Sequence, residues 1–246
     1  MLKMRWKTLE EIKYSLSEAN KIAIISCDFC ANLCDTGGRR GIRYFSDILE
    51  GWGKEVVLGK SIIPCCSEAV MSLAFRFYGK SLSSADMLVV LSCPTGLKAA
   101  SLCEPILPLY CPLEVDGGVM ITCREDSTLA SSICSACGHC VISHTGGICP
   151  LSGCPSGQLY GPCDNYPLRG TKCSVDPELH CIWKEIERKG DMAALRVLKE
   201  LHDNQDNARL PGPDSPATPP VLKKLAGWTI ARISAAGALR AFRYLK

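Results

Sequence analysis

The chain has 246 residues, and its net charge of +3 gives no electrostatic case for nucleic-acid binding. The N-terminal segment is charged and amphipathic, and no run of about 18 uncharged apolar residues occurs, so we expect neither a signal peptide nor a transmembrane helix. Cysteine, present 17 times, is the outlier. In the cytoplasm, where we expect this protein, dense and odd-numbered cysteines indicate metal or redox chemistry more than disulfides.

The first half of the chain predicts a Rossmann-like α/β domain over residues 21–126, preceded by an N-terminal helix within residues 1–20. Short apolar, β-branched runs predict buried strands, and the segments between them predict helices. The expected strands cover residues 21–26, 54–63, 85–93 and 117–122. Alternation at this spacing implies a parallel sheet with right-handed crossovers.

Cysteines follow the ends of three successive predicted strands. Cys27, Cys30 and Cys34 follow the first, Cys65 and Cys66 the second, and Cys93 the third. Because the carboxyl ends of parallel strands meet at one edge of a sheet, these side chains can converge there. We therefore consider a metal site made by Cys27, Cys30, Cys34 and Cys66 (or Cys65). A set of buried, redox-idle cysteines at a partner interface is the alternative.

The remaining cysteines of this half are scattered, and we expect them and Cys93 to pack as small apolar residues in the core. They are Cys103, Cys111 and Cys123. No GxGxxG motif follows the first strand, so we expect no nicotinamide cofactor. The chain also shows no flavin, phosphate or folate motif, and we expect no complete active site of its own.

A cysteine-rich module is expected over residues 127–188. Its eight cysteines are Cys134, Cys137, Cys140, Cys149, Cys154, Cys163, Cys173 and Cys181. The CxxCxxC run wraps a chain around three corners of an iron–sulfur cube, and a remote cysteine before a proline often completes the set. Structural zinc prefers two facing CxxC knuckles. We therefore favour two [4Fe–4S] clusters, with zinc as the alternative.

The C-terminal part predicts helices and a linker. A charged amphipathic helix is expected from about residue 183, and its part over residues 189–203 lies beyond the cysteine-rich module. A polar, proline-rich linker is expected to follow over residues 204–220. Residues 221–246 predict a basic amphipathic helix. This tail can dock on a partner, pack on its own protein or lie on an anionic membrane surface.

The module resembles the cysteine-rich domain of methylenetetrahydrofolate reductase small subunits of the MetV type. That family runs CxxCxxCxxxxTGGxCPxxxCxxxxxxGPC and then GxCxVxPxxxCxW, which residues 134–183 follow at all eight cysteines. The motif CDFCANLCDTGG, from Cys27, resembles the CxxCxxxCxTGG turn of the same family.

The resemblance implies an electron-transfer subunit of a methylenetetrahydrofolate reductase complex. Its partner would be a flavin-containing, barrel-type subunit that binds the folate, and a further electron-donor subunit is compatible with it. On this reading the chain relays electrons through [4Fe–4S] clusters to the partner's flavin. The alternative is a zinc-stabilised, non-redox scaffold of a folate or corrinoid methyl-transfer or reductase complex.

Overall fold

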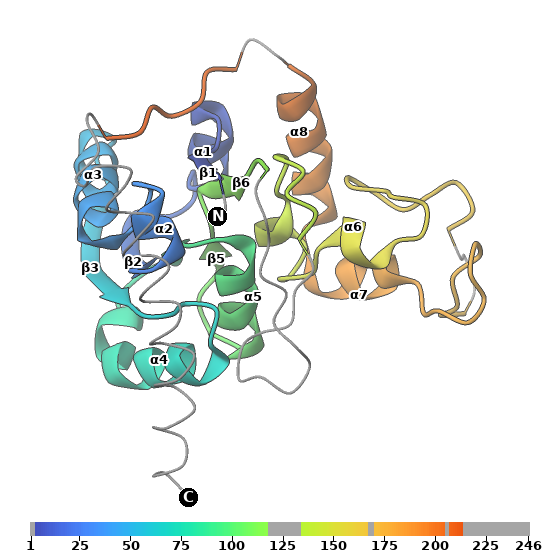
Figure 1. Ribbon diagram of the computed structural model, residues 1–246, viewed down its shortest axis with the longest axis horizontal. Coiled ribbons are helices and arrows are strands. Elements are labelled where there is room, and N and C mark those ends of the chain that lie inside the picture. Colours follow the sequence, from blue (N-terminus) through green and yellow to red (C-terminus); the bar gives the residue numbers. More distant parts are fainter. Residues whose placement is uncertain (1–2, 118–133, 167–169, 205–206, 214–246) are drawn as a thin grey trace, which may run out of the picture. The chain divides into compact units, whose positions relative to one another are not determined.

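The computed structural model describes residues 3–117, 134–166, 170–204 and 207–213 (Figure 1). The chain divides into a unit of residues Met1–Gly212 and a unit of residues Pro213–Lys246. The predicted strand near residues 117–122 and the predicted basic helix over residues 221–246 lie outside the described residues, as does Cys123.

A parallel four-stranded sheet forms the centre of this unit, in the order β3-β2-β4-β5. Its strands are β2 (Lys21–Cys27), β3 (Glu55–Ile62), β4 (Met87–Leu91) and β5 (Leu109–Tyr110). The two central strands are almost wholly buried, in keeping with their uninterrupted apolar sequences. The mixed α/β class, the parallel sheet and the first three predicted strands are confirmed.

Helices follow these strands, as predicted (Figure 1). A short helix, α2, and a longer one, α3, follow β2, whereas α4 follows β3 and α5 follows β4. Ser67 caps α4 by accepting a hydrogen bond from the backbone of Val70, and Pro94 occupies the first turn of α5. The bounds are α2 (Cys30–Leu33), α3 (Gly38–Gly51), α4 (Glu68–Leu82) and α5 (Pro94–Leu102).

The N-terminal segment differs from the predicted continuous helix. It begins with a strand, β1 (Met4–Trp6), that pairs antiparallel with β6 (Leu113–Val115), and only then forms α1 (Leu9–Ser15). Arg5 donates to Glu114 and Asp116 across this pair, and the ring of Trp6 stacks on Phe45 at 5.2 Å. These contacts reach residues far along the chain, so helical periodicity could not reveal them.

The cysteine-rich segment contains little regular structure until its end. It holds η1 (Ile142–His144), α6 (Pro150–Gly153), α7 (Ile182–Lys189) and α8 (Met192–Asp203). The helix predicted from residue 183 to 203 is therefore two helices, interrupted at Gly190. Asp191 starts the second by accepting hydrogen bonds from two backbone N–H groups of its first turn.

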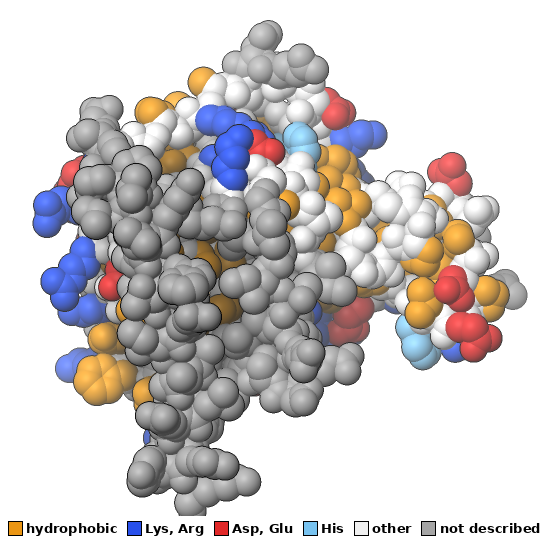
Figure 2. Space-filling view, in the orientation of Figure 1, with side chains coloured by type: hydrophobic (Ala, Val, Ile, Leu, Met, Phe, Trp, Pro, Cys, Tyr) orange, Lys and Arg blue, Asp and Glu red, His pale blue; other side chains and the backbone are white. Residues whose placement is uncertain are grey.

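The described residues of the first unit form two apolar cores. The larger surrounds the sheet, and the smaller joins Val141 to Trp183 and Ile186 of α7 and to Leu195 and Leu198 of α8. Figure 2 shows acidic and hydrophobic side chains close together at the right-hand end of the view, over the loops that lie beyond α6 and α7 in Figure 1. Among the described helices, none is long and apolar enough to cross a membrane.

Gly147 fixes the approach of the cysteine-rich segment to α5. Its φ is +81°, and a β-carbon there would lie 2.0 Å from Oγ of Ser101. We expect Gly147→Ala to lower the free energy of unfolding by about 2–4 kcal/mol, because left-handed strain and overpacking add. Gly157→Ala is the matched control: its φ is +64° with no atom within 4 Å, and it should cost about 1 kcal/mol. Equal losses by urea denaturation would contradict the close contact.

Candidate metal centres

Four cysteines of the module line one hollow in the described part of the chain: Cys134, Cys137, Cys140 and Cys149. Its other walls are mostly apolar, with Pro94 from α5, Val115 from β6 and Leu159 among them. The thiol of Cys134 lies near those of Cys137, Cys149 and Cys140. The sequence-predicted CxxCxxC…CP set is therefore brought together around one hollow, where Cys137 is exposed and the other three cysteines are half-buried.

The CxxCxxC run is held by the end of β6. Gly138 donates its backbone N–H to the carbonyl of Val115 at 3.0 Å, and Cys137 forms a bridge with Asp116. Ala136 and Gly138 both have positive φ, which turns the chain sharply between the ligands. The N–H of Ala136 donates to Sγ of Cys134 at 3.4 Å, the kind of contact that stabilises a thiolate ligand.

The Thr-Gly-Gly turn after this run has a packing role. The hydroxyl of Thr145, fully buried, bonds the carbonyl of Ile142 at 3.2 Å and also that of Ile148. It thereby closes a tight loop between Cys140 and Cys149, which places both cysteines on the same hollow.

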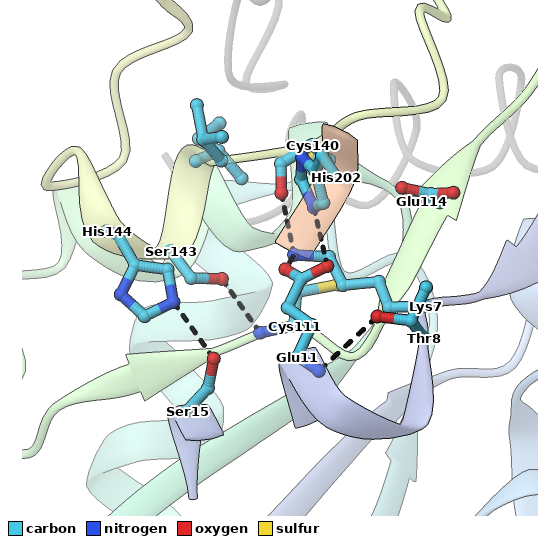
Figure 3. Close-up of polar contacts among 12 residues, drawn as sticks. Lys7, Thr8, Glu11, Ser15, Cys111, Glu114, Cys140, Ser143, His144 and His202 are labelled. Atoms are coloured by element: carbon cyan, nitrogen blue, oxygen red, sulfur yellow. Dashed lines mark hydrogen bonds and ion pairs between the residues drawn. The ribbon is translucent and has the colours of Figure 1, made fainter. Parts of the chain in front are cut away.

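A buried ion network lies directly behind Cys140 (Figure 3). The ammonium group of Lys7 donates to the carboxylate of Glu11 and to the carbonyl oxygen of Cys140, each at 2.6 Å. The other carboxylate oxygen of Glu11 contacts Nε2 of His202 at 2.9 Å, and Nδ1 of His202 contacts the hydroxyl of Tyr160 at 2.7 Å. The network joins α1, the CxxCxxC run and α8.

The network shifts the acidities of its members. Burial alone would raise the pKa of Glu11, but the charge of Lys7 and the hydrogen bond from His202 lower it to about 2. Burial opposes the charge of Lys7, yet Glu11 raises its pKa above the ordinary value. The pair is therefore ionised together, and a positive charge is fixed beside the thiol of Cys140.

A second polar group ties α1 to the module and to the end of β5. Oγ of Ser15 lies 3.0 Å from Nε2 of His144, and Ser143 accepts a hydrogen bond from the backbone of Cys111 at 3.0 Å. Burial lowers the pKa of His144 to about 4, so this histidine is neutral at pH 7. Cys111 is buried and donates to the carbonyl of Ser92, in keeping with the core role expected for it.

The other four cysteines of the module are less closely grouped. Cys173 and Cys181 lie on the two strands of a small hairpin closed by the pair Lys172–His180. Because Lys172 and His180 point to one face, Cys173 and Cys181 share the other. Cys154 and Cys181 both pack against the small core. Cys163 lies in the loop before the hairpin, where its carbonyl accepts a bond from the backbone of Tyr166.

The cysteines at the strand ends do converge, with a wider set than the sequence indicated. Cys27 and Cys30 were predicted as ligands. Cys27 lies next to Cys65, and Cys30 lies next to Cys93. Cys34 adjoins Cys30, and Cys66 adjoins Cys65. Cys93 is buried, as expected, but its neighbours are sulfurs rather than apolar side chains alone.

Within the described ranges, no three His, Cys, Asp or Glu side chains lie close enough to hold a single metal ion. A single zinc ion draws thiolates to about 2.3 Å, whereas an iron–sulfur cube spreads its four thiolates around a larger body. The hollow has four cysteines on its walls. His139 also lines it, while its ring faces that of His202 at 5.3 Å.

Together these features define an α/β protein with a cysteine-lined site beside the carboxyl edge of its sheet. Residues 115–208 match the family model described as methylene-tetrahydrofolate reductase C terminal. The match covers less than half of the chain and shows that this part is similar to the C-terminal part of methylenetetrahydrofolate reductases. Comparison with curated proteins and with solved structures gave no match.

The roles of Lys7 and Glu11 were not predicted from the sequence. Their charges resemble those of a solvated helix, and only the four-residue spacing, which allows an ion pair on one helical turn, hinted at contact. Burial of the pair could not be inferred, because it depends on Cys140 and His202, far along the chain.

Replacing Glu11 should test the network. Glu11→Gln leaves the Lys7 ammonium group buried without its carboxylate, so we expect a loss of about 3–5 kcal/mol in the free energy of unfolding at pH 7. Glu10→Gln, at the exposed neighbouring position, should cost less than about 0.5 kcal/mol. Urea denaturation of both variants measures the difference, and similar stabilities would show that the pair contributes nothing.

The same pair predicts an acid-sensitive stability. The folded pKa of Glu11 is depressed from 4.5 to about 2, so its contribution is complete above pH 4.5 and is lost as the pH falls through about 2. Between these values the wild type should lose stability more steeply than Glu11→Gln, which has no carboxyl group at this position. Parallel slopes in denaturation curves recorded across this range would refute the assignment.

Proposed function

We propose that the protein is the MetV-type iron–sulfur subunit of a methylenetetrahydrofolate reductase complex. The observation that supports this most directly is the meeting of Cys134, Cys137, Cys140 and Cys149 around one hollow. All four cysteines belong to the segment that matches the reductase family. The order of these ligands, three closely spaced and one remote before a proline, is that of a [4Fe–4S] site.

Two ligand sets are proposed within the module. The first is the set that lines the hollow, and the second comprises Cys154, Cys163, Cys173 and Cys181. Two [4Fe–4S] clusters, when bound, supply one-electron transfer. The shared face of Cys173 and Cys181 on their hairpin supports the second set, because it presents two thiols in the same direction.

The residues around the first site fix one positive charge near Cys140. The ammonium group of Lys7 is held within hydrogen-bond distance of the backbone of Cys140, and its charge lowers the pKa of the Cys140 thiol, but burial outweighs this charge and raises that pKa well above its ordinary value. The apolar side chains of Pro94, Val115 and Leu159 cover part of the site, whereas Cys137 is exposed to solvent. The solvent exposure of the ligands and the fixed positive charge would tune the reduction potential of a bound cluster.

The chemistry on the folate is assigned to a partner. In this proposal a flavin-containing, barrel-type subunit binds methylenetetrahydrofolate and reduces it to methyltetrahydrofolate, and the present chain passes electrons to that flavin. The chain itself is an accessory subunit. The match of residues 115–208 to a reductase family supports this division of work, because the matched part is described as the C-terminal part of such an enzyme.

Metal analysis of anaerobically purified full-length protein tests the proposal. We expect at least about eight iron atoms with matching acid-labile sulfide for the two sets in the module. Stoichiometric zinc at these cysteines, without sulfide or visible absorbance, would support the redox-inactive scaffold instead.

A variant of the first set makes the test specific. Cys137→Ser should remove about four iron atoms and abolish electron delivery to the partner's flavin, since Cys137 lies on the hollow. The matched control is Cys103→Ser, because the sulfur of Cys103 donates to the carbonyl of Ala99 in α5 and lies outside both sets. Unchanged flavin reduction by Cys137→Ser in a stopped-flow experiment would rule out the relay.

A further inference from the structure

Helix α4 turns one face to the interior and leaves large apolar side chains on the other. Met71, Ala74 and Leu82 are buried, whereas Leu73 is 61% and Phe77 is 81% exposed. The outer face of a helix at a protein surface is normally polar. Large apolar side chains grouped on such a face mark a surface that another molecule covers.

The apolar surface continues from α4 to the end of α5. The thiol of Cys103 donates to the carbonyl oxygen of Glu68 at 3.6 Å, which places the end of α5 beside the first turn of α4. Leu102, the last residue of α5, is 48% exposed. Figure 2 shows hydrophobic side chains beside Lys and Arg side chains at the lower left, where Figure 1 places α4. Leu73, Phe77 and Leu102 are called the α4 patch below.

Two rows of exposed side chains run along α4, each with a residue at every fourth position. The polar row is Glu68, Ser72, Arg76 and Lys80. The apolar row, one position later, is Ala69, Leu73 and Phe77. The polar row is therefore acidic at the start of the helix and basic at its end.

This order of charges is complementary to its own reverse. If two copies of α4 pack face to face and antiparallel about a two-fold axis, their polar rows lie on the same side of the contact and run in opposite directions. Glu68 of each copy then faces Lys80 of the other. In a parallel pair the polar rows lie on opposite sides and do not meet. The charge order therefore favours a second copy of the chain, in antiparallel contact, over an unrelated partner.

From this geometry we propose that α4 forms an antiparallel, two-fold contact with α4 of a second copy, so that the protein is a homodimer in solution. The axis lies at the level of Ala74, halfway between Glu68 and Lys80. Phe77 of each copy then lies between Ala69 and Leu73 of the other. The small side chain of Ala69 leaves room for the ring.

The extent of the contact predicts a weak dimer. Stable interfaces bury about 800 Å² on each partner. One face of a 15-residue helix supplies less than this area, even with Leu102 beside its first turn. We therefore expect monomer and dimer to coexist at micromolar protein concentrations.

Sedimentation velocity of the full-length protein, purified anaerobically and kept reduced, tests the proposal. The wild type should change from monomer to dimer between about 1 and about 100 μM. Leu73→Ser should raise the dissociation constant at least about tenfold, because both copies lose an apolar side chain from the centre of the contact. Leu179→Ser is the matched control: Leu179 is 43% exposed on the hairpin of the module, and its replacement should leave the dissociation constant unchanged.

A wild type that stays monomeric over this range would overturn the proposal and leave the α4 patch to an unrelated protein or a lipid surface. Equal effects of the two leucine variants would overturn it as well, because the contact would then not lie on α4.

Charge reversals test the antiparallel order. Lys80→Glu opposes two acidic side chains at both ends of the contact, and Glu68→Lys opposes two basic ones. Each should raise the dissociation constant about tenfold at low salt. The variant that carries both changes should dimerise like the wild type. An equimolar mixture of the two single variants should also form dimers, because both contacts then join a lysine to a glutamate.

Urea denaturation shows whether the single variants are folded. Single reversals without effect would overturn the antiparallel contact. So would single reversals that abolish the dimer when neither the double variant nor the mixture recovers it, since the charges would then act within one chain. These residues lie outside the cysteine-rich module, so metal content separates a failure of the dimer from a failure of the proposed relay.

Discussion

The ammonium group of Lys7 lies inside the protein, and the arrangement of the site depends on how its charge is satisfied. Glu11 neutralises it at 2.6 Å, and the carbonyl of Cys140 accepts its second hydrogen bond. A buried ion pair contributes little net stability, but removal of one partner costs several kcal/mol. The pair therefore acts mainly as a positional constraint, because it joins α1, the CxxCxxC run and, through His202, α8.

The cysteines are brought together in two different ways. Loops at the sheet edge bring cysteines together through strand register, whereas the module brings them together through tight turns at Ala136, Gly138 and Thr145. Pro94 lines the hollow of the module, whereas the preceding residue, Cys93, belongs to the cysteines at the sheet edge. The α/β domain is thus more than a support for the module, since its own loops form one wall of the module's site.

The sequence predicts those parts whose determinants are local. The apolar run of β2 and the cysteines at its end were predictable because period and turn residues are short-range signals. The strand β1 was not, because Met4–Trp6 has no period and pairs only with β6, more than 100 residues away. Gly190 was missed as a helix break because its exclusion of a side chain depends on contact with the carbonyl of His144. Likewise, the sequence alone could not show that Cys65 and Cys93 lie close to Cys27, because this depends on the register of β2 with β3 and β4.

The two ends of the first unit meet at β1, and this has a consequence for folding. The bond from Lys7 to Cys140 spans 133 positions, and that from Arg209 to Trp6 spans 203. Contacts of such separation form late, because the loop between them must close first. The strand–helix–strand units can fold earlier from local contacts. The N-terminal segment then closes over a chain already synthesised to beyond residue 209, so the contact between Lys7 and the cysteine-lined hollow is completed last.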